Sequence, residues 1–397
     1  MLLFFGMTVE KQSICMRYLL YGLVLCSTSI LHSQHLFDGI FRRLSKSSRN
    51  QGGLTIGVHQ KNNETDKIFQ QLRFLSNATV AQQLLILLAD ATLIWELENS
   101  ANEAFSTCPV SNCIATGSLP SPDFSPDAVI FRYLLPVLPR RDAHQIWIFF
   151  SLESPLNTPS FANLNGVVNW TATYRLDSDI PIPYGLYKPI GRVISSEYKQ
   201  SWFAGKSSLV AWFSSNCFTM NQREAYVREL SRYIQVDAYG SCGRHRCRRG
   251  SPACWEMLAK KYKFYLAFEN SNCRHYITEK LFFNAFQHNV IPVVMGAPRE
   301  DYLRLVPPNS FIHVDDFDTP RQLAEYLKHV AENQSLYDSF FKWRSHYEAV
   351  NTRFWCRLCA MLNHPVPKTY DSLESWWRPP DVCKPPKLFA VYDEAPR

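Results

Sequence analysis

The amino-acid sequence predicts an α/β fold built on parallel sheets, and three patterns carry this prediction. Residues 264–296 form one strand–helix–strand unit, in which two apolar runs flank a stretch with helical spacing. The alternation of strand and helix recurs over 208–239 and 309–333. Earlier in the chain, residues 127–137 and 145–152 are continuous apolar runs, which are typical of strands buried on both faces.

The chain is long enough for two domains. Its 397 residues fit two units of roughly 150 residues each, and prolines and glycines before residue 200 predict the connection between them. The predicted segments are a cytoplasmic tail (1–17), a signal-anchor membrane segment (18–34), a stem (35–80), an N-terminal domain (81–200), a C-terminal domain (201–365) and a C-terminal tail (366–397).

The membrane prediction rests on residues 18–31, which are apolar apart from small hydroxyl residues. Lys11 and Arg17 precede this run and favour an amino terminus that stays in the cytoplasm. The run is shorter than the roughly twenty residues of a usual membrane helix, so a cleaved signal peptide is the alternative. No small-x-small cleavage pattern follows the run, and this favours the signal-anchor.

Cysteines and glycosylation sequons together indicate the secretory pathway, where disulfides persist. The chain has 12 cysteines. Four Asn-x-Ser/Thr triplets begin at Asn63, Asn77, Asn169 and Asn333. The spacing of Cys356 and Cys359 also fits half of a zinc site, but the sequence has no second half for it, so disulfides are the preferred interpretation. The spacing leaves the cysteine pairing open.

The overall composition is that of a globular protein, with 46% hydrophobic and 19% charged residues. The net charge of +7 is compatible with an anionic partner. Because the basic residues are dispersed and no RNA-binding signature is present, the sequence does not favour nucleic acid as that partner.

Polar residues follow the strand at 264–268, where a parallel sheet places its ligands. These residues are Glu269, Asn270, Tyr276, Thr278, Glu279 and Lys280. Arg223 lies in the first turn of the helix that follows the strand at 209–213, so it can face the same crevice as Lys280. Two cations at two helix starts would suit a diphosphate. The alternative is that both are solvated residues of amphipathic helices.

Glu153 directly follows the strand at 145–152. A carboxylate at the carboxyl end of a buried strand faces the crevice side of an α/β domain, where it can serve as a general base. A plain capping or loop role is the alternative.

Several motifs, in order along the chain, resemble those of the α1,3-fucosyltransferases, from about residue 105 to 383. The donor motif is similar to Glu269-Asn270-Ser271 followed by Tyr276-x-Thr278-Glu279-Lys280. The acceptor motif is similar to Leu152-Glu153-Ser154-Pro155 and Tyr174-Arg175-x-Asp177-Ser178-Asp179, and the third motif to Ser214-Ser215-Asn216-Cys217 with Arg223. Residues 354–359 resemble the core-type branch of invertebrates and plants.

The resemblance implies a GT-B fold, in which two Rossmann-like domains face a cleft, with the acceptor on residues 81–200 and GDP-fucose on residues 201–365. It implies an inverting transfer in which Glu153 is the general base. Arg223 and Lys280 would contact the diphosphate, Glu279 the ribose, and Asn270 and Tyr276 the nucleotide region. No tightly bound cofactor or metal is implied, although divalent cations could stimulate turnover.

The resemblance further implies a single-pass type II protein of the Golgi membrane with a luminal catalytic domain. The expected partners are GDP-fucose, the N-glycan of glycoproteins and the membrane. The expected acceptor is the innermost, Asn-linked N-acetylglucosamine. Two alternatives stay open: a Lewis-type enzyme that acts on outer N-acetyllactosamine, and a catalytically silent glycan-binding protein of the same fold.

Overall fold

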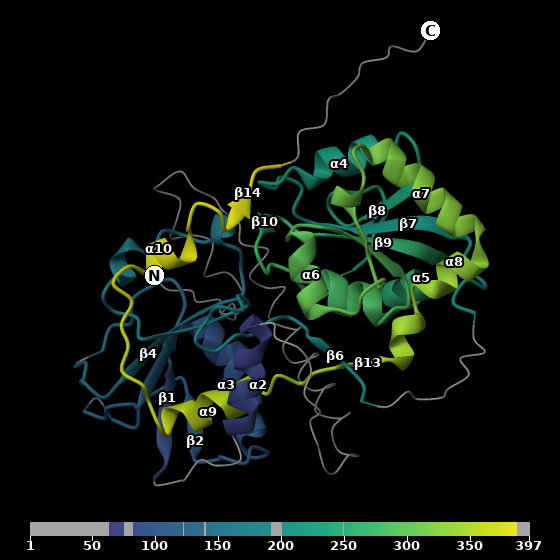
Figure 1. Ribbon diagram of the computed structural model, residues 1–397. Helices are drawn as coiled ribbons and strands as arrows, with labels where there is room; N and C mark the ends of the chain where they lie inside the picture. The colour runs from purple at the N-terminus through teal and green to yellow at the C-terminus, as the bar shows by residue number, and fades with distance from the viewer. Residues whose placement is uncertain are drawn as a thin grey trace, which may run out of the picture.

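The computed structural model describes residues 63–74, 82–121, 123–138, 140–191, 201–248 and 250–386 (Figure 1). The predicted signal-anchor at 18–34 and the sequon at Asn77 lie outside these ranges. Within them, no helix is both long and apolar enough to cross a membrane.

The first half of the molecule is built on a five-stranded parallel sheet with the order β2-β1-β3-β4-β5. Its strands are β1 (Leu84–Leu88), β2 (Cys113–Thr116), β3 (Ala128–Phe131), β4 (Ile146–Ser151) and β5 (Trp170–Thr173). Helix α3 (Ala91–Phe105) connects β1 to β2 and begins where the Asp90 carboxylate accepts hydrogen bonds from the Thr92 and Leu93 amides. The predicted strand at 145–152 is β4, and all of its residues are buried.

The second half is built on another five-stranded parallel sheet with the order β12-β11-β9-β7-β8. Its strands are β7 (Ser208–Phe213), β8 (Val236–Tyr239), β9 (Tyr262–Phe268), β11 (Ile291–Met295) and β12 (Ile312–His313). The sequence prediction of an α/β fold with parallel sheets is therefore confirmed.

Helices cover both faces of this second sheet. Alternate residues of one strand serve opposite faces: Phe264, Leu266 and Phe268 of β9 pack toward one set of helices, and Tyr265 and Ala267 toward the other. The first set is α4 (Arg223–Leu230), α7 (Pro320–Glu332) and α8 (Gln334–Ser339). The second set is α5 (Pro252–Lys261), the π-helix η4 (Lys280–Phe286) and α6 (Arg299–Leu305). Short 3-10 turns complete the chain at η2 (Pro155–Asn157), η3 (Ala162–Leu164), η5 (Val314–Asp316) and η6 (Lys342–Ser345).

Within the predicted strand–helix–strand unit of residues 264–296, apolar residues recur at helical spacing from Ile277, but the helix begins only at Lys280. Before Lys280, hydrogen bonds from Thr278 to the buried Glu269 carboxylate take the place of a helical turn. The Glu269 carboxylate accepts hydrogen bonds from both the amide and the hydroxyl of Thr278. His275 adopts a left-handed conformation with φ 61°. Tyr276 therefore lies on a loop at the sheet edge.

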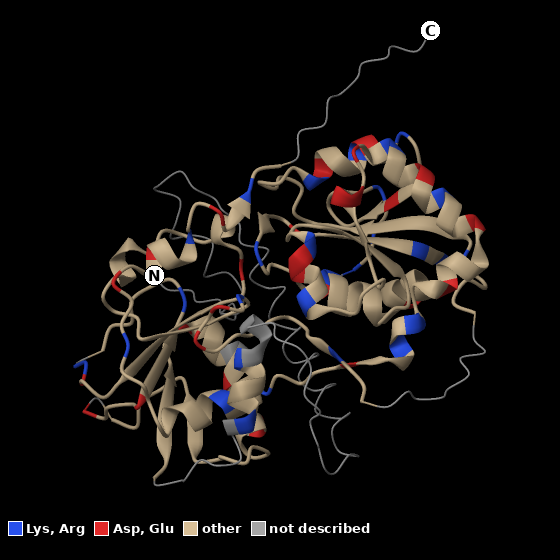
Figure 2. Cartoon of the chain, in the orientation of Figure 1, with Lys and Arg blue, Asp and Glu red and all other residues tan. Residues whose placement is uncertain are grey.

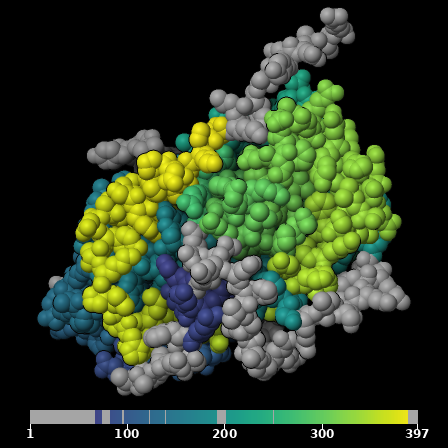
Figure 3. All heavy atoms as spheres, viewed as in Figure 1, coloured from purple at the N-terminus to yellow at the C-terminus, as the bar shows by residue number. Residues whose placement is uncertain are grey.

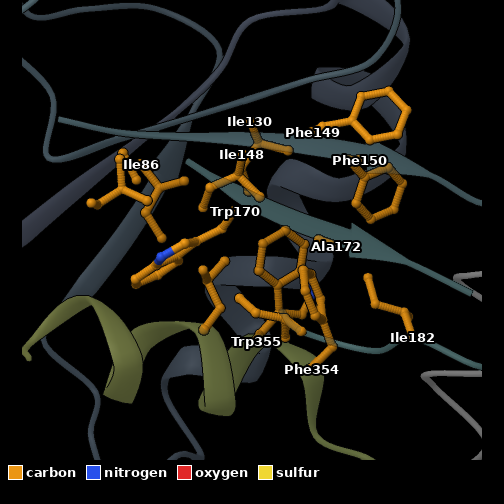
Figure 4. Packing of buried hydrophobic residues seen from close by; sticks show 14 of the residues in the cluster. Ile86, Ile130, Ile148, Phe149, Phe150, Trp170, Ala172, Ile182, Phe354 and Trp355 are labelled. Atoms are coloured by element: carbon orange, nitrogen blue, oxygen red, sulfur yellow. The ribbon is translucent and has the colours of Figure 1, made fainter. Parts of the chain in front are cut away.

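The C-terminal part of the chain returns to the first half. Helix α9 (Phe354–Leu362) packs Phe354 and Trp355 beneath the first sheet (Figure 4). Disulfides Cys108–Cys356 and Cys113–Cys359 fasten it there. The predicted domain boundary at 365 places α9 in the second domain. Because the apolar side chains and disulfides of α9 attach it to the first half, that placement is wrong.

The predicted stem ends earlier than residue 80, because α2 (Asn63–Phe74) packs against the body of the protein. Ile68 is fully buried, and Lys67 donates a hydrogen bond to the Ser178 carbonyl at 2.7 Å. The buried Arg357 of α9 also bonds the Gln71 side chain. These contacts make α2 part of the folded unit.

Two short antiparallel pairs join the halves. One is β6 (Tyr187–Pro189) with β13 (Tyr347–Ala349). The other is β10 (Asn272–Cys273) with β14 (Cys383–Lys384), next to α10 (Leu373–Trp377). Disulfide Cys273–Cys383 closes the second pair, and Cys217–Cys242 and Cys247–Cys254 lie within the second half. The preference for disulfides over zinc is confirmed for these ten cysteines. In Figure 2, acidic and basic residues are scattered over helices and loops of both halves, and the strands of the two sheets are mostly uncharged.

Candidate active site

The candidate site lies where the carboxyl ends of β4 and β9 face each other. Glu153 follows β4, and Glu269 and Asn270 follow β9. The Tyr276 hydroxyl donates a hydrogen bond of 2.8 Å to Glu153 Oε1, and Asn270 Nδ2 lies 3.4 Å from the same oxygen. Three of the predicted site residues are therefore in one hydrogen-bonded group that spans the two halves.

Nearby residues hold Glu153 at this position. Its Oε1 also accepts hydrogen bonds from the Ser154 amide at 2.8 Å and from Asn157 Nδ2 at 3.4 Å. The Ser154 and Ser271 hydroxyls are 2.7 Å apart and add a buried contact between the halves. All four of these bonds to Glu153 involve Oε1. Glu153 is half-buried, and within the described residues its Oε2 takes part in none of these bonds.

Lys280 forms the cationic part of the site. Its ammonium lies 2.9 Å from Glu269 Oε2 and 3.2 Å from Glu279 Oε1, and it donates to the Thr278 hydroxyl at 2.9 Å. Burial alone would lower the pKa of Lys280, but the two carboxylates outweigh burial and raise its pKa above the ordinary value. Lys280 therefore stays charged, and the interpretation as a freely solvated lysine is wrong.

Arg223 is buried and joins the ends of two strands. Its guanidinium donates to the Phe268 carbonyl at 2.7 Å, to the Ser214 hydroxyl at 3.0 Å and to the Asn216 carbonyl at 3.0 Å. Its charge opposes protonation of Lys280, which places both cations in the same electrostatic environment. The solvated alternative is therefore wrong for Arg223 as well, and Arg223 also has a structural role at the end of β9.

Glu269 was predicted to lie at this edge of the sheet but was given no role of its own, although it pairs with Lys280 and is 1% exposed. Gly296 makes room for it: a Cβ at this position would lie 2.8 Å from the Glu269 Cβ, and φ is +149°. The sequence does contain a signal for this close approach. Glu269 follows one strand, and Gly296 follows the next strand of the predicted unit. Tyr184 was also given no role, and its hydroxyl donates to the Leu152 carbonyl at 2.8 Å.

Two of the predicted glycosylation residues, Asn333 and Asn169, have side-chain partners outside this site. Asn333 is exposed at the start of α8, where its side-chain oxygen caps the Leu336 amide. Asn169 is half-buried, and its side chain bonds the Trp147 amide and the Lys368 carbonyl. Asn63 is the first residue of α2. Across the described ranges, no group of three His, Cys, Asp or Glu side chains is arranged to hold a metal ion.

Comparisons with known proteins agree with the sequence motifs. Residues 203–376 match the family model for the C-terminal part of glycosyltransferase family 10 (fucosyltransferase), and residues 82–185 match the N-terminal fucosyltransferase model. Alpha-(1,3)-fucosyltransferase C of Drosophila melanogaster is 38% identical over 301 residues, which cover 68% of this chain and 70% of that protein. The chain belongs to the α1,3-fucosyltransferase family.

Another relative in the α1,3-fucosyltransferase family is glycoprotein 3-alpha-L-fucosyltransferase A of Drosophila melanogaster. It is 42% identical over 285 residues, which cover 70% of this chain but 56% of that relative's length. A crystal structure of an alpha1,3-fucosyltransferase with GDP-fucose is also similar, with a TM-score of 0.48 and 18% identity over 69% of this chain and 88% of that chain.

Proposed function

We propose that this chain transfers L-fucose from GDP-β-L-fucose, in α1,3 linkage and with inversion, to the innermost N-acetylglucosamine of N-glycans. The observation that carries the proposal is the cross-half group of Glu153, Tyr276 and Asn270. A base from one half and donor-side residues from the other are the arrangement that a two-domain GT-B transferase needs.

The first chemical task is activation of the acceptor. In the proposed reaction, Glu153 Oε2 accepts the proton of the acceptor 3-hydroxyl as the oxygen bonds to the anomeric carbon. The bonds from Tyr276 and Asn270 keep the carboxylate oriented during this transfer. Because the bond to GDP breaks on the opposite side of the same carbon, the configuration inverts.

The second task is stabilisation of the leaving group. Departure of GDP builds negative charge on the diphosphate, and Lys280, whose pKa is raised by Glu269 and Glu279, is suited to oppose it as a cation. Arg223 adds positive charge from the end of β7. In our proposal, Glu279 turns from Lys280 to the donor ribose when GDP-fucose binds, and this frees the ammonium for phosphate. A tightly bound metal is not part of this proposal.

The acceptor class separates this proposal from its closest alternative. The name of glycoprotein 3-alpha-L-fucosyltransferase A, which is 42% identical, supports a glycoprotein acceptor. Alpha-(1,3)-fucosyltransferase 7 of Mus musculus is 39% identical, so the choice between the two acceptor classes needs an experiment. The test offers purified protein a core N-glycan and a terminal N-acetyllactosamine with GDP-fucose. Transfer only to the core glycan supports the proposal. Transfer only to lactosamine favours the Lewis-type alternative, and transfer to neither favours a silent glycan-binding protein.

We also propose that the protein is a type II Golgi membrane protein, anchored by residues 18–34 with its folded part in the lumen. The disulfides of the folded part support an oxidising compartment. Co-staining of the full chain with Golgi markers, combined with protease protection in sealed membranes, tests this. Digestion of the folded part in sealed vesicles would contradict it.

A further inference from the structure

The C-terminal segment 373–384, which we call the C-terminal clamp, crosses from the first half to the second. In Figure 1, α10 lies over the first half and β14 lies beside β10 of the second. Figure 3 shows the same segment in yellow, reaching from one half to the other. We propose that the clamp is a positioning element for fucosyl transfer, which sets the separation between the base and the donor site. This inference rests on the proposed function.

On the first half, the clamp holds the loop that directly follows Glu153. Arg378 donates to the carbonyls of Pro155, Thr158 and Pro159 at 3.2, 2.7 and 2.7 Å. An ion pair of 2.7 Å with Glu374 keeps the Arg378 guanidinium in place. Because Glu153 is two residues before Pro155, a fixed loop also fixes the base.

Trp377 adds a buried anchor on the same half. It is fully buried, and its ring packs against Phe149 and Phe161 with centroids 5.6 and 6.1 Å apart. Its indole N–H donates to the Thr158 hydroxyl at 2.9 Å. Arg175 completes the anchor by donating to the Trp377 carbonyl at 3.1 Å. The clamp is therefore packed into the first half and not only laid over it.

On the second half, the clamp holds the loop that directly precedes Tyr276. Strand β14 pairs with β10, and the disulfide Cys273–Cys383 makes that pairing covalent. The Arg274 amide donates to the Val382 carbonyl at 2.8 Å. The clamp thus binds the chain just after Glu153 and just before Tyr276. These two residues form the hydrogen bond between the halves.

The pairing of β6 with β13 indicates which motion of the halves the clamp would prevent. Pairing of β6 with β13 joins the halves through three residue pairs, and its residues are half-buried or exposed. Such a ribbon can act as a hinge. Without the clamp, rotation about it would separate Glu153 from Tyr276. Most of each core would stay in place, because the two sheets belong to separate strand sets, but Tyr276 would lose its packing in the core of the first half.

The experiment compares variants that loosen either end of the clamp. The double variant Cys273→Ser/Cys383→Ser removes the disulfide, and Arg378→Met removes the hold on residues 155–159. The disulfide control is Cys247→Ser/Cys254→Ser, whose bond lies within the second half. The arginine control is Arg321→Met, which removes an exposed pair with Glu325 that has the same four-residue spacing.

Three measurements are made on each folded, full-length variant: affinity for GDP by calorimetry, kcat for transfer, and hydrogen exchange. Both clamp variants should lose roughly tenfold or more in kcat, because small displacements of reacting groups are costly, while GDP affinity stays within about twofold. Exchange should accelerate over 154–161 and 272–277. The control variants should change none of these quantities.

Wild-type kcat in both clamp variants would overturn the inference. So would a parallel loss of GDP affinity and kcat, which indicates general damage to the second half. If the wild-type protein transfers no fucose, the proposed function fails. Hydrogen exchange still tests the role of the clamp in that case. Unchanged exchange over 154–161 and 272–277 in the clamp variants rejects the inference, and faster exchange over both loops supports it.

Discussion

The Tyr276 hydroxyl lies 2.8 Å from Glu153 Oε1 and donates to it across the boundary between the two halves. Glu153 follows β4 of the first sheet, and Tyr276 lies on the loop that precedes η4 in the second half. This contact is short only when the halves are correctly placed. It therefore links the relative position of the halves to the orientation of the proposed base.

Replacement of Tyr276 by Phe should lower kcat by roughly tenfold, because a hydrogen bond to a charged group is worth about 1.5–3 kcal/mol. The ring at position 276 would keep its packing against the Tyr174 ring, whose centroid lies 5.0 Å away. Steady-state kinetics measure the effect. Tyr233→Phe is the matched control, since the Tyr233 hydroxyl also bonds a glutamate, Glu229, at 2.9 Å, but on α4 and away from the contact. Equal kcat values for the two variants would contradict the assigned role.

Replacement of Lys280 by Met should raise the KM for GDP-fucose and also destabilise the protein. It leaves Glu269 buried without its cation, and a broken buried ion pair costs about 3–5 kcal/mol. Chemical denaturation measures the free energy of unfolding. The double variant Lys280→Met/Glu269→Gln should recover part of the stability but not the KM. Recovery of both would show that Lys280 does not contact the donor.

Among the predicted glycosylation residues, Asn333 should carry a glycan and Asn169 should not. Asn333 is exposed and uses only its side-chain oxygen in the helix cap, so its nitrogen can be modified. The Asn169 nitrogen donates to the Lys368 carbonyl at 2.7 Å, and a glycan there would disturb the bonds that join β5 to the C-terminal segment. Mass spectrometry of the full chain purified from membranes measures occupancy. A glycan on Asn169 at high occupancy would refute this assignment.

Stability should fall as the pH rises above about 10, because burial raises the pKa of several tyrosines well above the ordinary 10.0. These residues are Tyr174, Tyr184, Tyr276 and Tyr302. In the unfolded chain they lose their protons near pH 10, whereas in the folded protein they keep them. Their stabilising effect is therefore complete below pH 10 and is lost above it. Denaturation curves from about pH 8 to 11 test this, and a flat free energy of unfolding would contradict it.

The sheets could be predicted from sequence because a buried parallel strand is a continuous apolar run, as at residues 145–152 and 264–268. The start of η4 could not be predicted. Apolar spacing continues back through Ile277, but the bonds of Glu269 to Thr278 prevent a helix there. That competition depends on where the end of β9 lies in three dimensions.

For the site, the positions of Glu153, Arg223 and Lys280 at strand ends and helix starts indicated candidates, and the resemblance to a known family gave each of them a predicted role. Glu269 occupies a similar position, and its importance follows from its burial and from the approach of Gly296, which spacing alone does not give. The return of α9 to the first half also escaped prediction, because the partners of Cys356 and Cys359 are about 250 residues away along the chain.

The most direct test of the account is replacement of Glu153 by Gln, with GDP affinity and fucose transfer measured on the same preparation. The variant keeps the shape of the side chain and a hydrogen-bond acceptor for Tyr276, but it lacks a basic carboxylate. We expect GDP affinity to be unchanged and transfer to the core glycan to fall by a factor on the order of 10²–10⁴, as for loss of a general base. Transfer at the wild-type rate would contradict the central claim that Glu153 is the base of a site shared by both halves.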